Sequence, residues 1–562
     1  MPTSGTKYIF VSGGVLSGLG KGVTAASIGF LLKSRGYKVT PIKFENYLNV
    51  DSGLINPIEH GDPFLCDDGT EADMDMGTYE KILGKDVYRH NFVTMGQIYS
   101  AVINRERNFE YQGEDVEAIP HITDEILHRI DVASKAEGGA DFVIIELGGT
   151  AGEYQNMLYY EASRILKTVK KAPVVHVHVS YLPTPHHLGE PKTKPTQLSV
   201  RFLLSMGIQP DFIVCRGEKA IDKRRRERLA MFCNVDAENV ISNPDEDTPY
   251  AVPVTFEDQQ FAQKILSMFG MPQTKEPDLS EWKRMLEQVK ESKKKPIEVA
   301  IVGKYFGTGD YELRDSYAAL MDALDHAGWA AGVRVKTRWI NSQKIEKGEP
   351  VEELLKGVSG VIVPIGWGAR GVEGMLKAIQ YARENKVPYL GLCYGMQLAC
   401  VEYARNVVKL PGANTTEVDE ATPYPIIHMN PMQEENQKRR AYGGTMRLGR
   451  WECKVKPDSI ADQSYMEFNG YHNPDQKTVW ERHRHRYEFN DEFAKQLEEA
   501  GLVFSGRSIV ENLAEVIELP EAVHPFFVGT QYHPEYRSTP LVPHPLFQSY
   551  VRACIKQAGM VK

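Results

Sequence analysis

The sequence lacks the features expected of a disulfide-linked, zinc-bound or membrane-inserted protein. Its 562 residues include seven cysteines, an odd number with no paired spacing and no CxxC motif. Scattered single cysteines argue against a disulfide framework and against a structural zinc site. No apolar run is long enough to cross a membrane, and the run near the N-terminus is too short for a signal peptide. We therefore expect a cytoplasmic protein with no membrane partner.

Basic charge is also scarce for a protein that binds nucleic acid. The formal net charge is −9, with 25% charged and 42% apolar residues. This balance predicts a well-packed globular protein and no nucleic-acid partner. The length predicts more than one domain.

A glycine-rich loop near the start of the chain lacks two residues of the usual phosphate-binding pattern. The stretch from Lys7 to Phe44 predicts a strand, a loop, a helix and a second strand. Val15 stands where the pattern has its first glycine, and Gly22 follows Lys21 where a hydroxyl residue is usual. A loop of this kind at a helix N-terminus binds phosphate, with Lys21 reaching the outer phosphates. The alternative is a glycine-rich turn that binds no ligand.

Because the loop has no hydroxyl ligand for magnesium, carboxylates are expected to hold the metal. Glu146 directly follows the apolar run 142–145. An acidic residue at a strand end beside a phosphate loop suits a hard, hydrated cation. A second acidic stretch contributes further candidates, with a solvated acidic loop as the alternative: Asp67, Asp68, Glu71, Asp73 and Asp75.

Two basic stretches follow in the first half of the chain. Lys192 and Lys194 flank Thr193 in a segment stiffened by prolines. Such a segment can hold a triphosphate, and the alternative is a charged surface loop. The run KRRRER, residues 223–228, lies at the start of a predicted helix and is typical of a solvated face.

The second half is centred on Cys393, which lies between Gly391 and Gly395 after an apolar run. The pattern G-x-C-x-G predicts a nucleophile elbow, where a strand turns sharply into a helix and holds up the reactive side chain. His533 and Glu535 provide a base and the carboxylate that orients it. On an extended segment both would point to the same side. The alternatives are a buried core cysteine and a surface His-Pro turn.

The stretch RHRHRYE, residues 482–488, combines basic residues with one aromatic residue. We expect it to serve a substrate or an interdomain contact, and the alternative is a solvated basic strand.

A thiol site and an ATP-type phosphate site on one chain predict coupled chemistry. Ammonia released from a carboxamide would displace phosphate from an acceptor activated by phosphoryl transfer.

Along nearly its whole length the sequence resembles the CTP synthase family. The resemblance rests on motifs in the family's order: SGGVLSGLGKG, IKFENYLNVD, DMDMGTYE, IPHITDEI, IELGGTAG, KTKPTQLSV, FCNV, GVEGM, GLCYGMQ, GGTMRLG, ERHRHRYE and QYHPE. It implies an α/β fold with a P-loop-type, mostly parallel sheet in an amidoligase (synthetase) domain and a second α/β domain of the class I glutamine amidotransferase type. A charged stretch ending at Pro296 marks the boundary. We expect the synthetase domain at 1–272, a linker at 273–296 and the amidotransferase domain at 297–562.

The resemblance also implies the reaction and the partners. The family is a carbon–nitrogen ligase of pyrimidine biosynthesis that makes CTP from UTP, ATP and glutamine. ATP is the co-substrate, Mg²⁺ the cofactor, GTP an allosteric activator and CTP a feedback inhibitor. A homotetramer is implied, with filament formation left open.

Site residues follow from the resemblance by position. The ATP site comprises Ser17, Gly18, Leu19, Gly20, Lys21, Gly22, Val23, Lys43 and Asp75. The magnesium ligands are Asp75 and Glu146. The UTP and CTP site comprises Ser17, Glu153, Tyr154, Gln155, Lys192, Thr193, Lys194, Pro195, Thr196, Gln197 and Arg228. The glutamine site comprises Gly366, Tyr394, Gly395, Met396, Gln397, Glu417 and Arg484. The catalytic triad comprises Cys393, His533 and Glu535.

Several segments depart from the family's usual residues. Glu45-Asn46-Tyr47 replaces Asp-Pro-Tyr, Glu153-Tyr154-Gln155 replaces Asp-Ile-Glu, Arg228 replaces Lys, and Ile365 and Trp367 replace Gly and Phe. An exchange of Arg for Lys is not neutral at a phosphate contact. Two further hypotheses therefore stay open: a paralogue that aminates another pyrimidine nucleotide or a cofactor carboxylate, and a non-catalytic filament-forming or regulatory homologue. The retained loop lysine and triad argue against the second.

Overall fold

The structure is a computed structural model that describes residues 5–271, 275–305, 307–308, 311–312, 314–439 and 442–560. The chain forms two compact units, Met1–Asp51 with Thr78–Lys283, and Ser52–Gly77 with Arg284–Lys562. The first unit ends at residue 283, inside the linker predicted at 273–296. The predicted start of that linker, at residues 272–274, lies outside the described residues. The sequence did not predict that residues 52–77 pack with the second unit.

The first unit is built on a seven-stranded sheet in which every neighbouring pair is parallel. The strand order is β5-β2-β6-β1-β7-β8-β9. Its strands are β1 (Lys7–Gly13), β2 (Val39–Glu45), β5 (Phe92–Thr94), β6 (Phe142–Leu147), β7 (Val174–Tyr181), β8 (Phe212–Gly217) and β9 (Val240–Pro244). Nearly all of their residues are buried, as expected for a parallel sheet that is covered on both faces.

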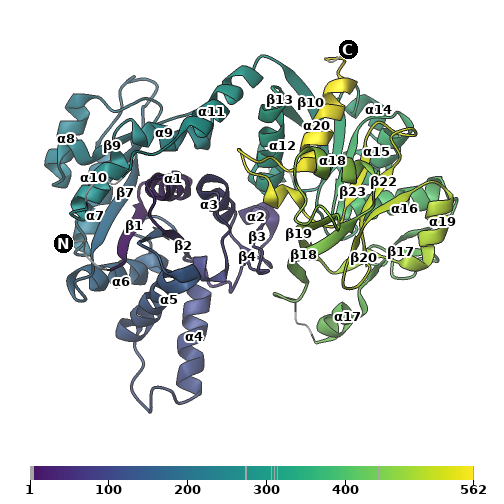
Figure 1. Ribbon diagram of the computed structural model, residues 1–562. Coiled ribbons are helices and arrows are strands. Elements are labelled where there is room, and N and C mark those ends of the chain that lie inside the picture. The colour runs from purple at the N-terminus through teal and green to yellow at the C-terminus, as the bar shows by residue number, and fades with distance from the viewer. Residues whose placement is uncertain are drawn as a thin grey trace. The chain divides into compact units, whose positions relative to one another are not determined.

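Helices cover both faces of this sheet, with α1 on one face and α5 and α6 on the other (Figure 1). The helices are α1 (Lys21–Ser34), α4 (Met95–Arg107), α5 (Thr123–Lys135), α6 (Met157–Thr168), α7 (Lys194–Ser205), α8 (Lys223–Cys233), α9 (Val252–Glu257) and α10 (Phe261–Met268). Two further helices span the boundary between the units in sequence: α3 (Asp75–Leu83) and α11 (Ser280–Ser292). Because all strands are parallel, the loops after β1, β2, β6 and β7 leave the same edge of the sheet.

The second unit contains a nine-stranded sheet of order β13-β10-β14-β15-β23-β22-β21-β18-β19. It is parallel from β13 to β23 and antiparallel from β23 to β19. Its strands are β10 (Pro296–Gly303), β13 (Arg334–Asn341), β14 (Gly360–Val363), β15 (Tyr389–Leu392), β18 (Arg447–Val455), β19 (Thr478–His485), β21 (Val503–Ser508), β22 (Ala514–Leu519) and β23 (Phe527–Thr530). Two buried apolar clusters pack on this sheet, so the unit has its own core.

Helices and short strands complete the second unit. The helices are α2 (Pro57–His60), α12 (Ala318–Ala330), α13 (Ser342–Glu346), α14 (Val351–Leu354), α15 (Val372–Glu384), α16 (Tyr394–Asn406), α17 (Pro431–Lys438), α18 (Ile460–Glu467), α19 (Ala494–Glu499) and α20 (Pro545–Gln557). The short strands are β3 (Phe64–Leu65), β4 (Glu71–Ala72), β11 (Gly307–Thr308), β12 (Tyr311–Glu312), β16 (Asn414–Thr415), β17 (Pro425–Met429) and β20 (Tyr487–Phe489). The predicted α/β fold class is confirmed for both units.

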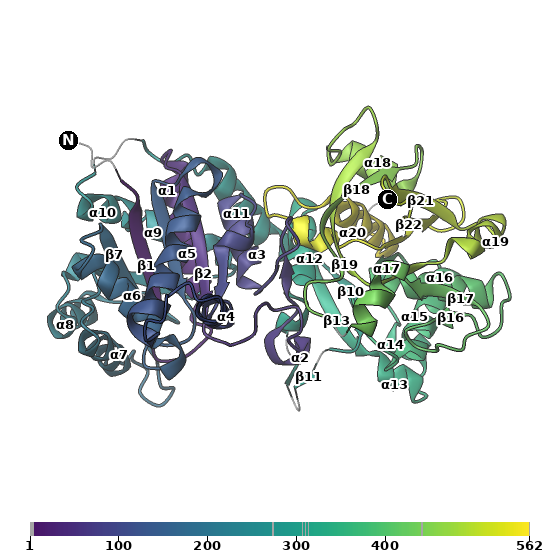
Figure 2. The same ribbon diagram turned by 90° about the horizontal axis from the view of Figure 1, so that it is seen from below.

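Residues 52–77 form an excursion of the N-terminal half of the chain into the second unit. The purple elements α2, β3 and β4 lie beside the teal and green elements of that unit in Figure 1, and α2 lies near β11 in Figure 2. Asp67 accepts a hydrogen bond from Arg482 Nε over 2.6 Å, and Tyr536 donates to Asp62 over 3.0 Å. The ring of Phe64 packs edge-on against Tyr536. The excursion is therefore held by buried ion pairs and by apolar contacts.

Among the described residues, no helix is both long enough and apolar enough to span a bilayer.

Candidate active sites

Cys393 lies at the turn between β15 and α16, as the nucleophile-elbow pattern predicts. Its backbone has φ 50° and ψ −96°, a strained conformation for a residue with a side chain. The N–H of Cys393 donates to the carbonyl of Thr530 over 2.6 Å and so fixes the turn against β23. A Cβ at Gly395 would lie 2.1 Å from the carbonyl oxygen of Val363, so only glycine allows α16 to start this close to β14.

The predicted partners of the thiol lie beside it. His533 Nδ1 and Glu535 Oε1 are 2.7 Å apart, which is the predicted hydrogen bond. The predicted extended path is wrong, because His533 caps a 3₁₀ helix (Pro534–Arg537) that contains Glu535. Proline at the first position favours this turn. All three side chains are buried, with Cys393 4% exposed.

Electrostatics favour a protonated imidazole at this site. Burial alone would lower the pKa of His533, but Glu535 and a Cys393 thiolate outweigh it and raise that pKa above its ordinary value. The Nδ1 bond to Glu535 leaves Nε2 for exchange with the sulfur. The arrangement is that of a thiol nucleophile, a base and an orienting carboxylate.

The loop after β14 brings a second group of predicted residues to the thiol. The N–H of Gly368 donates to Glu417 Oε1 over 2.7 Å, and Tyr394 donates to the carbonyl of Gly368 over 2.9 Å. Burial raises the pKa of Glu417, although the Gly368 N–H and Lys304 oppose the shift. A Cβ at Gly366 would lie 3.0 Å from Lys304 Cε and 3.1 Å from the Tyr394 ring.

Lys304 in this loop region was not predicted as a site residue. Its ammonium donates to the carbonyl of Gly368 over 2.7 Å and lies 4.7 Å from the centre of the Tyr394 ring. Burial lowers the pKa of Lys304 to about 8, with Glu417 opposing and Arg370 assisting. The only local sequence signal is a lysine directly after a buried strand, which is too common to be specific.

Arg484, predicted to bind glutamine, is 3% exposed and is held by the excursion. Its Nε donates to Glu71 Oε1 over 2.7 Å, and its Nη2 donates to the carbonyl of Gly53 over 3.1 Å. Its guanidinium also lies 5.2 Å from the centre of the Trp367 ring. Its carbonyl oxygen is 3.9 Å from the Cys393 sulfur. The structure thus places Arg484 at the thiol and ties its side chain to residues 53 and 71.

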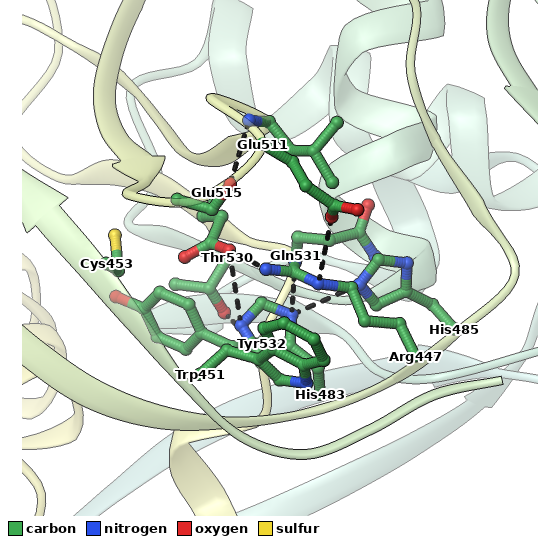
Figure 3. Close-up of polar contacts among 12 residues, drawn as sticks. Arg447, Trp451, Cys453, His483, His485, Glu511, Glu515, Thr530, Gln531 and Tyr532 are labelled. Atoms are coloured by element: carbon green, nitrogen blue, oxygen red, sulfur yellow. Dashed lines mark hydrogen bonds and ion pairs between the residues drawn. The ribbon is translucent and has the colours of Figure 1, made fainter. Parts of the chain in front are cut away.

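The basic stretch 482–488 lies mostly in β19 and is not a solvated strand. Its first four side chains are nearly or fully buried. Figure 3 shows the buried polar cluster around His483, in which Arg447 pairs with Glu515 over 2.8 Å. Burial, with Arg447 nearby, lowers the pKa of His483 well below its ordinary value. Burial raises the pKa of Glu515 to about 7 against the pull of Arg447.

In the first unit the glycine-rich loop joins β1 to α1, as predicted. Gly20 caps α1 with φ 79°, and Lys21 begins the helix. The ammonium of Lys21 donates to the carbonyl of Gly149 over 2.9 Å, which ties the loop to the segment after β6. Val15, which replaces the expected glycine, has φ 81°. This is a conformation that β-branched residues rarely adopt, so the loop stores strain.

The metal candidates divide into two groups. Glu146 is 1% exposed and accepts hydrogen bonds from Lys43 over 2.8 Å and from Tyr79 over 2.5 Å. Asp75 begins α3, and its N–H donates to Asp73. Asp67 and Glu71 of the acidic stretch pair with arginines, and no group of three or more His, Cys, Asp and Glu side chains within the described ranges forms a metal site.

The predicted pyrimidine-nucleotide residues lie in the segments that follow β1, β6, β7 and β8. Thr193, Thr196 and Gln197 are buried at the start of α7, whereas Lys192 is half-buried and Lys194 exposed. Pro195 occupies the first turn of that helix, Arg228 is exposed on α8, and Ser17 and Gly18 are exposed in the loop.

The departure at Glu153-Tyr154-Gln155 has a local structural explanation only for its first residue. Glu153 accepts hydrogen bonds from the Thr150 N–H over 2.8 Å and from Asn46 over 2.9 Å. Tyr154 is 92% exposed, and Gln155 is also exposed. Asn46 and Glu153 each belong to a segment that departs from the family, so the two departures contact one another.

Comparison with known proteins gives matches over both halves. Residues 7–271 match the family model described as "CTP synthase N-terminus", and residues 312–553 match "Glutamine amidotransferase class-I". The chain is 46% identical to the CTP synthase of Caldanaerobacter subterraneus subsp. tengcongensis, over 98% of each chain. It is also 46% identical to that of Thermococcus gammatolerans, over 98% of each chain, and 47% identical to that of Carboxydothermus hydrogenoformans, over 98% of this chain and 99% of the relative.

Proposed function

The chain belongs to the CTP synthase family and therefore makes CTP from UTP, ATP and glutamine, and we propose which of its residues perform each step. The observation that carries the assignment of these residues is the buried Cys393 at a strained elbow, beside His533 and Glu535, which are hydrogen-bonded to each other. The synthetase domain is proposed at 1–272, the linker at 273–296 and the amidotransferase domain at 297–562.

Cys393, His533 and Glu535 are proposed to hydrolyse glutamine. His533 takes the thiol proton, and the sulfur attacks the carboxamide carbon of glutamine. The tetrahedral oxyanion collapses to a thioester when His533 gives its proton to the leaving ammonia, and water then hydrolyses the thioester. Backbone N–H groups of Tyr394 and of the strand end at Gly366 are proposed to stabilise the oxyanion. Glu535 keeps the imidazole oriented throughout.

The glutamine itself is proposed to bind along the first turn of α16. Glu417 suits its α-ammonium group and Arg484 its α-carboxylate, because each side chain has the opposite charge. The other proposed contacts come from Gly366, Tyr394, Gly395, Met396 and Gln397. Since Arg484 also pairs with Glu71, the carboxylate of glutamine would share or replace that partner.

The first unit is proposed to activate UTP with ATP, the co-substrate of the family. The loop Ser17–Val23, with Lys21 and Lys43, is proposed to hold the ATP phosphates. Mg²⁺ is proposed to bind Glu146 and Asp75. Carboxylate oxygens are the donors that this ion prefers, and it needs only one or two of them when phosphates and water complete its shell. Bound Mg²⁺ would neutralise the charge of the transferring phosphate.

UTP, and CTP as a feedback inhibitor, are proposed to bind the segment Lys192–Gln197 with Ser17, Glu153, Tyr154, Gln155 and Arg228. GTP is proposed as the activator and a homotetramer as the assembly. A cytoplasmic location is proposed as well. These proposals rest on membership of the family.

Two variants test the division of labour. Cys393→Ala should lose glutamine-dependent CTP formation but keep CTP formation with added ammonia, because only ammonia release uses the thiol. Lys21→Ala should stop amination from either nitrogen source and spare glutamine hydrolysis. Both are measured with ATP, Mg²⁺ and a panel of pyrimidine triphosphates, with and without chelator. If folded Cys393→Ala lost both activities together, the proposed two-site division would be wrong.

A further inference from the structure

Gln531 touches the reacting sulfur, although neither the sequence patterns nor the steps above assign it a role. It directly follows β23 and lies two residues before His533. Its side chain is 1% exposed, and its Nε2 lies 3.5 Å from Cys393 Sγ with the geometry of a hydrogen bond. Nearly complete burial makes this contact costly to leave unsatisfied.

The backbone holds Gln531 in place from both sides. The N–H of Gln531 donates to the carbonyl of Glu515 over 2.8 Å, and the carbonyl of the preceding Thr530 accepts from the N–H of Cys393. Figure 3 shows Gln531 between Thr530 and Tyr532 beside Glu515. The sulfur and the Gln531 side chain are thus carried by neighbouring strands in fixed register.

A chain of hydrogen bonds decides which end of the Gln531 amide faces the sulfur. The carbonyl of Tyr487 can only accept, and it receives a hydrogen bond from Gln397 Nε2 over 2.8 Å. The same nitrogen donates to Gln531 Oε1 over 3.2 Å. Flipping either amide would set two acceptors or two donors against each other. The oxygen of Gln531 is therefore turned to Gln397, and its N–H group is turned to Cys393.

We infer that Gln531 is a further catalytic residue of the thiol site, whose side-chain N–H stabilises the Cys393 thiolate. The inference rests on the proposed role of Cys393 as the nucleophile. The thiol proton passes to His533 Nε2, and the negative charge left on Sγ then faces an imidazolium and the Gln531 amide. Gln531 itself gains and loses no proton, so its N–H donor is present at every pH. In the thiol form, the S–H can instead point to the carbonyl of Arg484.

The size of the effect follows from the geometry. A hydrogen bond to a charged group contributes about 1.5–3 kcal/mol, and a long N–H···S contact belongs at the lower end of that range. At about 1.4 kcal/mol for each factor of ten, loss of the donor should reduce the thiolate population at neutral pH about tenfold.

Alkylation of Cys393 by iodoacetamide in the full-length protein tests this directly, without glutamine. Gln531→Met keeps the volume and removes the donor. We expect alkylation at pH 7 to slow about tenfold, with the midpoint of its pH profile moved up by about one unit and the rate at high pH unchanged. Gln548→Met, a matched change in α20, should behave as the parent protein. The labelled peptide is identified by mass spectrometry against Cys393→Ser.

An unchanged pH profile in folded Gln531→Met would overturn the inference and leave Gln531 as a packing residue. If that variant does not fold, Gln397→Met decides, since it removes the bond that orients the Gln531 amide. An intermediate profile is expected, and an unchanged one overturns the inference. In these variants the ratio of glutamine-dependent to ammonia-dependent CTP formation should be lower than in the parent protein, as the alkylation rate is. If Cys393→Ala kept glutamine-dependent activity, the proposed function would fail, whereas the alkylation profile would still report on Gln531.

Discussion

Replacing Asp67 by asparagine should destabilise the second unit, because one carboxylate there serves three arginines. Asp67 Oδ1 accepts from Arg482 over 2.6 Å and from Arg537 over 3.2 Å, and its Oδ2 accepts from Arg450 over 3.0 Å. The side chain of Arg482 is 1% exposed, whereas those of Arg537 and Arg450 are 31% and 42% exposed. Asparagine has the same shape but carries no charge, so the change removes the negative charge of Asp67 from beside the buried Arg482 cation.

The magnitude follows from which arginines water can reach. Removing one partner of a buried ion pair costs about 3–5 kcal/mol. Water can compensate Arg537 and Arg450 in part, and asparagine still offers one acceptor, so we expect about 3 kcal/mol. The second unit comprises residues 52–77 and 284–562. At about 2.1 cal/mol/K of unfolding entropy per residue, each kcal/mol lowers the melting temperature of a unit of this size by about 1.6 °C, so the transition should fall by about 5 °C.

Differential scanning calorimetry of the full chain measures this transition, with Asp68→Asn as the matched control. Asp68 is exposed and caps its own turn through the Thr70 N–H, so its loss should cost less than about 1 kcal/mol. Arg482 and its neighbours hold the pKa of Asp67 below its ordinary value, although burial opposes them. The stabilisation is therefore present above the unfolded-state pKa of about 3.9 and is lost as the pH falls through the lower folded-state value. Equal melting temperatures for Asp67→Asn and Asp68→Asn near pH 7 would refute the reasoning.

Two further predictions concern the elbow and the buried cluster of Figure 3. Gly395→Ala puts a Cβ 2.1 Å from the carbonyl oxygen of Val363 and must displace the elbow, so glutamine hydrolysis should fall about 100-fold or more. Gly5→Ala, where a Cβ meets nothing within 4 Å, is the control in the same glutaminase assay, and equal activity of the two would contradict the steric argument. Since burial raises the pKa of Glu515 from 4.5 to about 7, stability should decline as the pH rises through that interval. Glu515→Gln should flatten the decline in urea midpoints between about pH 5 and pH 8, and parallel declines would exclude Glu515 as its source.

The parts of the fold with local signals could be predicted from the sequence. Continuous apolar runs such as 142–145 predicted buried strands, and the glycines before Lys21 predicted the loop at the start of α1. The elbow at Cys393 was equally local, because sterics at Gly395 permit few other turns. The His533–Glu535 bond was also predicted, but through an extended path. Pro534 instead starts a 3₁₀ turn, which brings the two side chains together in a different way.

The parts that depend on contacts distant in sequence could not be predicted. Asp67 and Glu71 were candidates for a metal site or a solvated loop, and the stretch 482–488 for a substrate or interdomain contact or a solvated strand. In the structure these two charged stretches neutralise each other in the interior. Charged side chains are usually solvated, so neither stretch, considered alone, indicates that it pairs with the other. Gln531 was missed for a similar reason, since a glutamine at a strand end gives no sign of the amide chain that orients it.

The excursion of residues 52–77 sets the order in which the two units can finish folding during synthesis. Arg482 follows its partner Asp67 by 415 residues. A ribosome adds roughly 5–20 residues per second, so Asp67 waits roughly 20–80 s for its partner to be made. The first unit can close around the two ends of the excursion during that time, but the second unit cannot be completed until the excursion docks. A fragment that begins after residue 283 would lack this piece and would leave Arg482 and Arg484 without the carboxylates of Asp67 and Glu71.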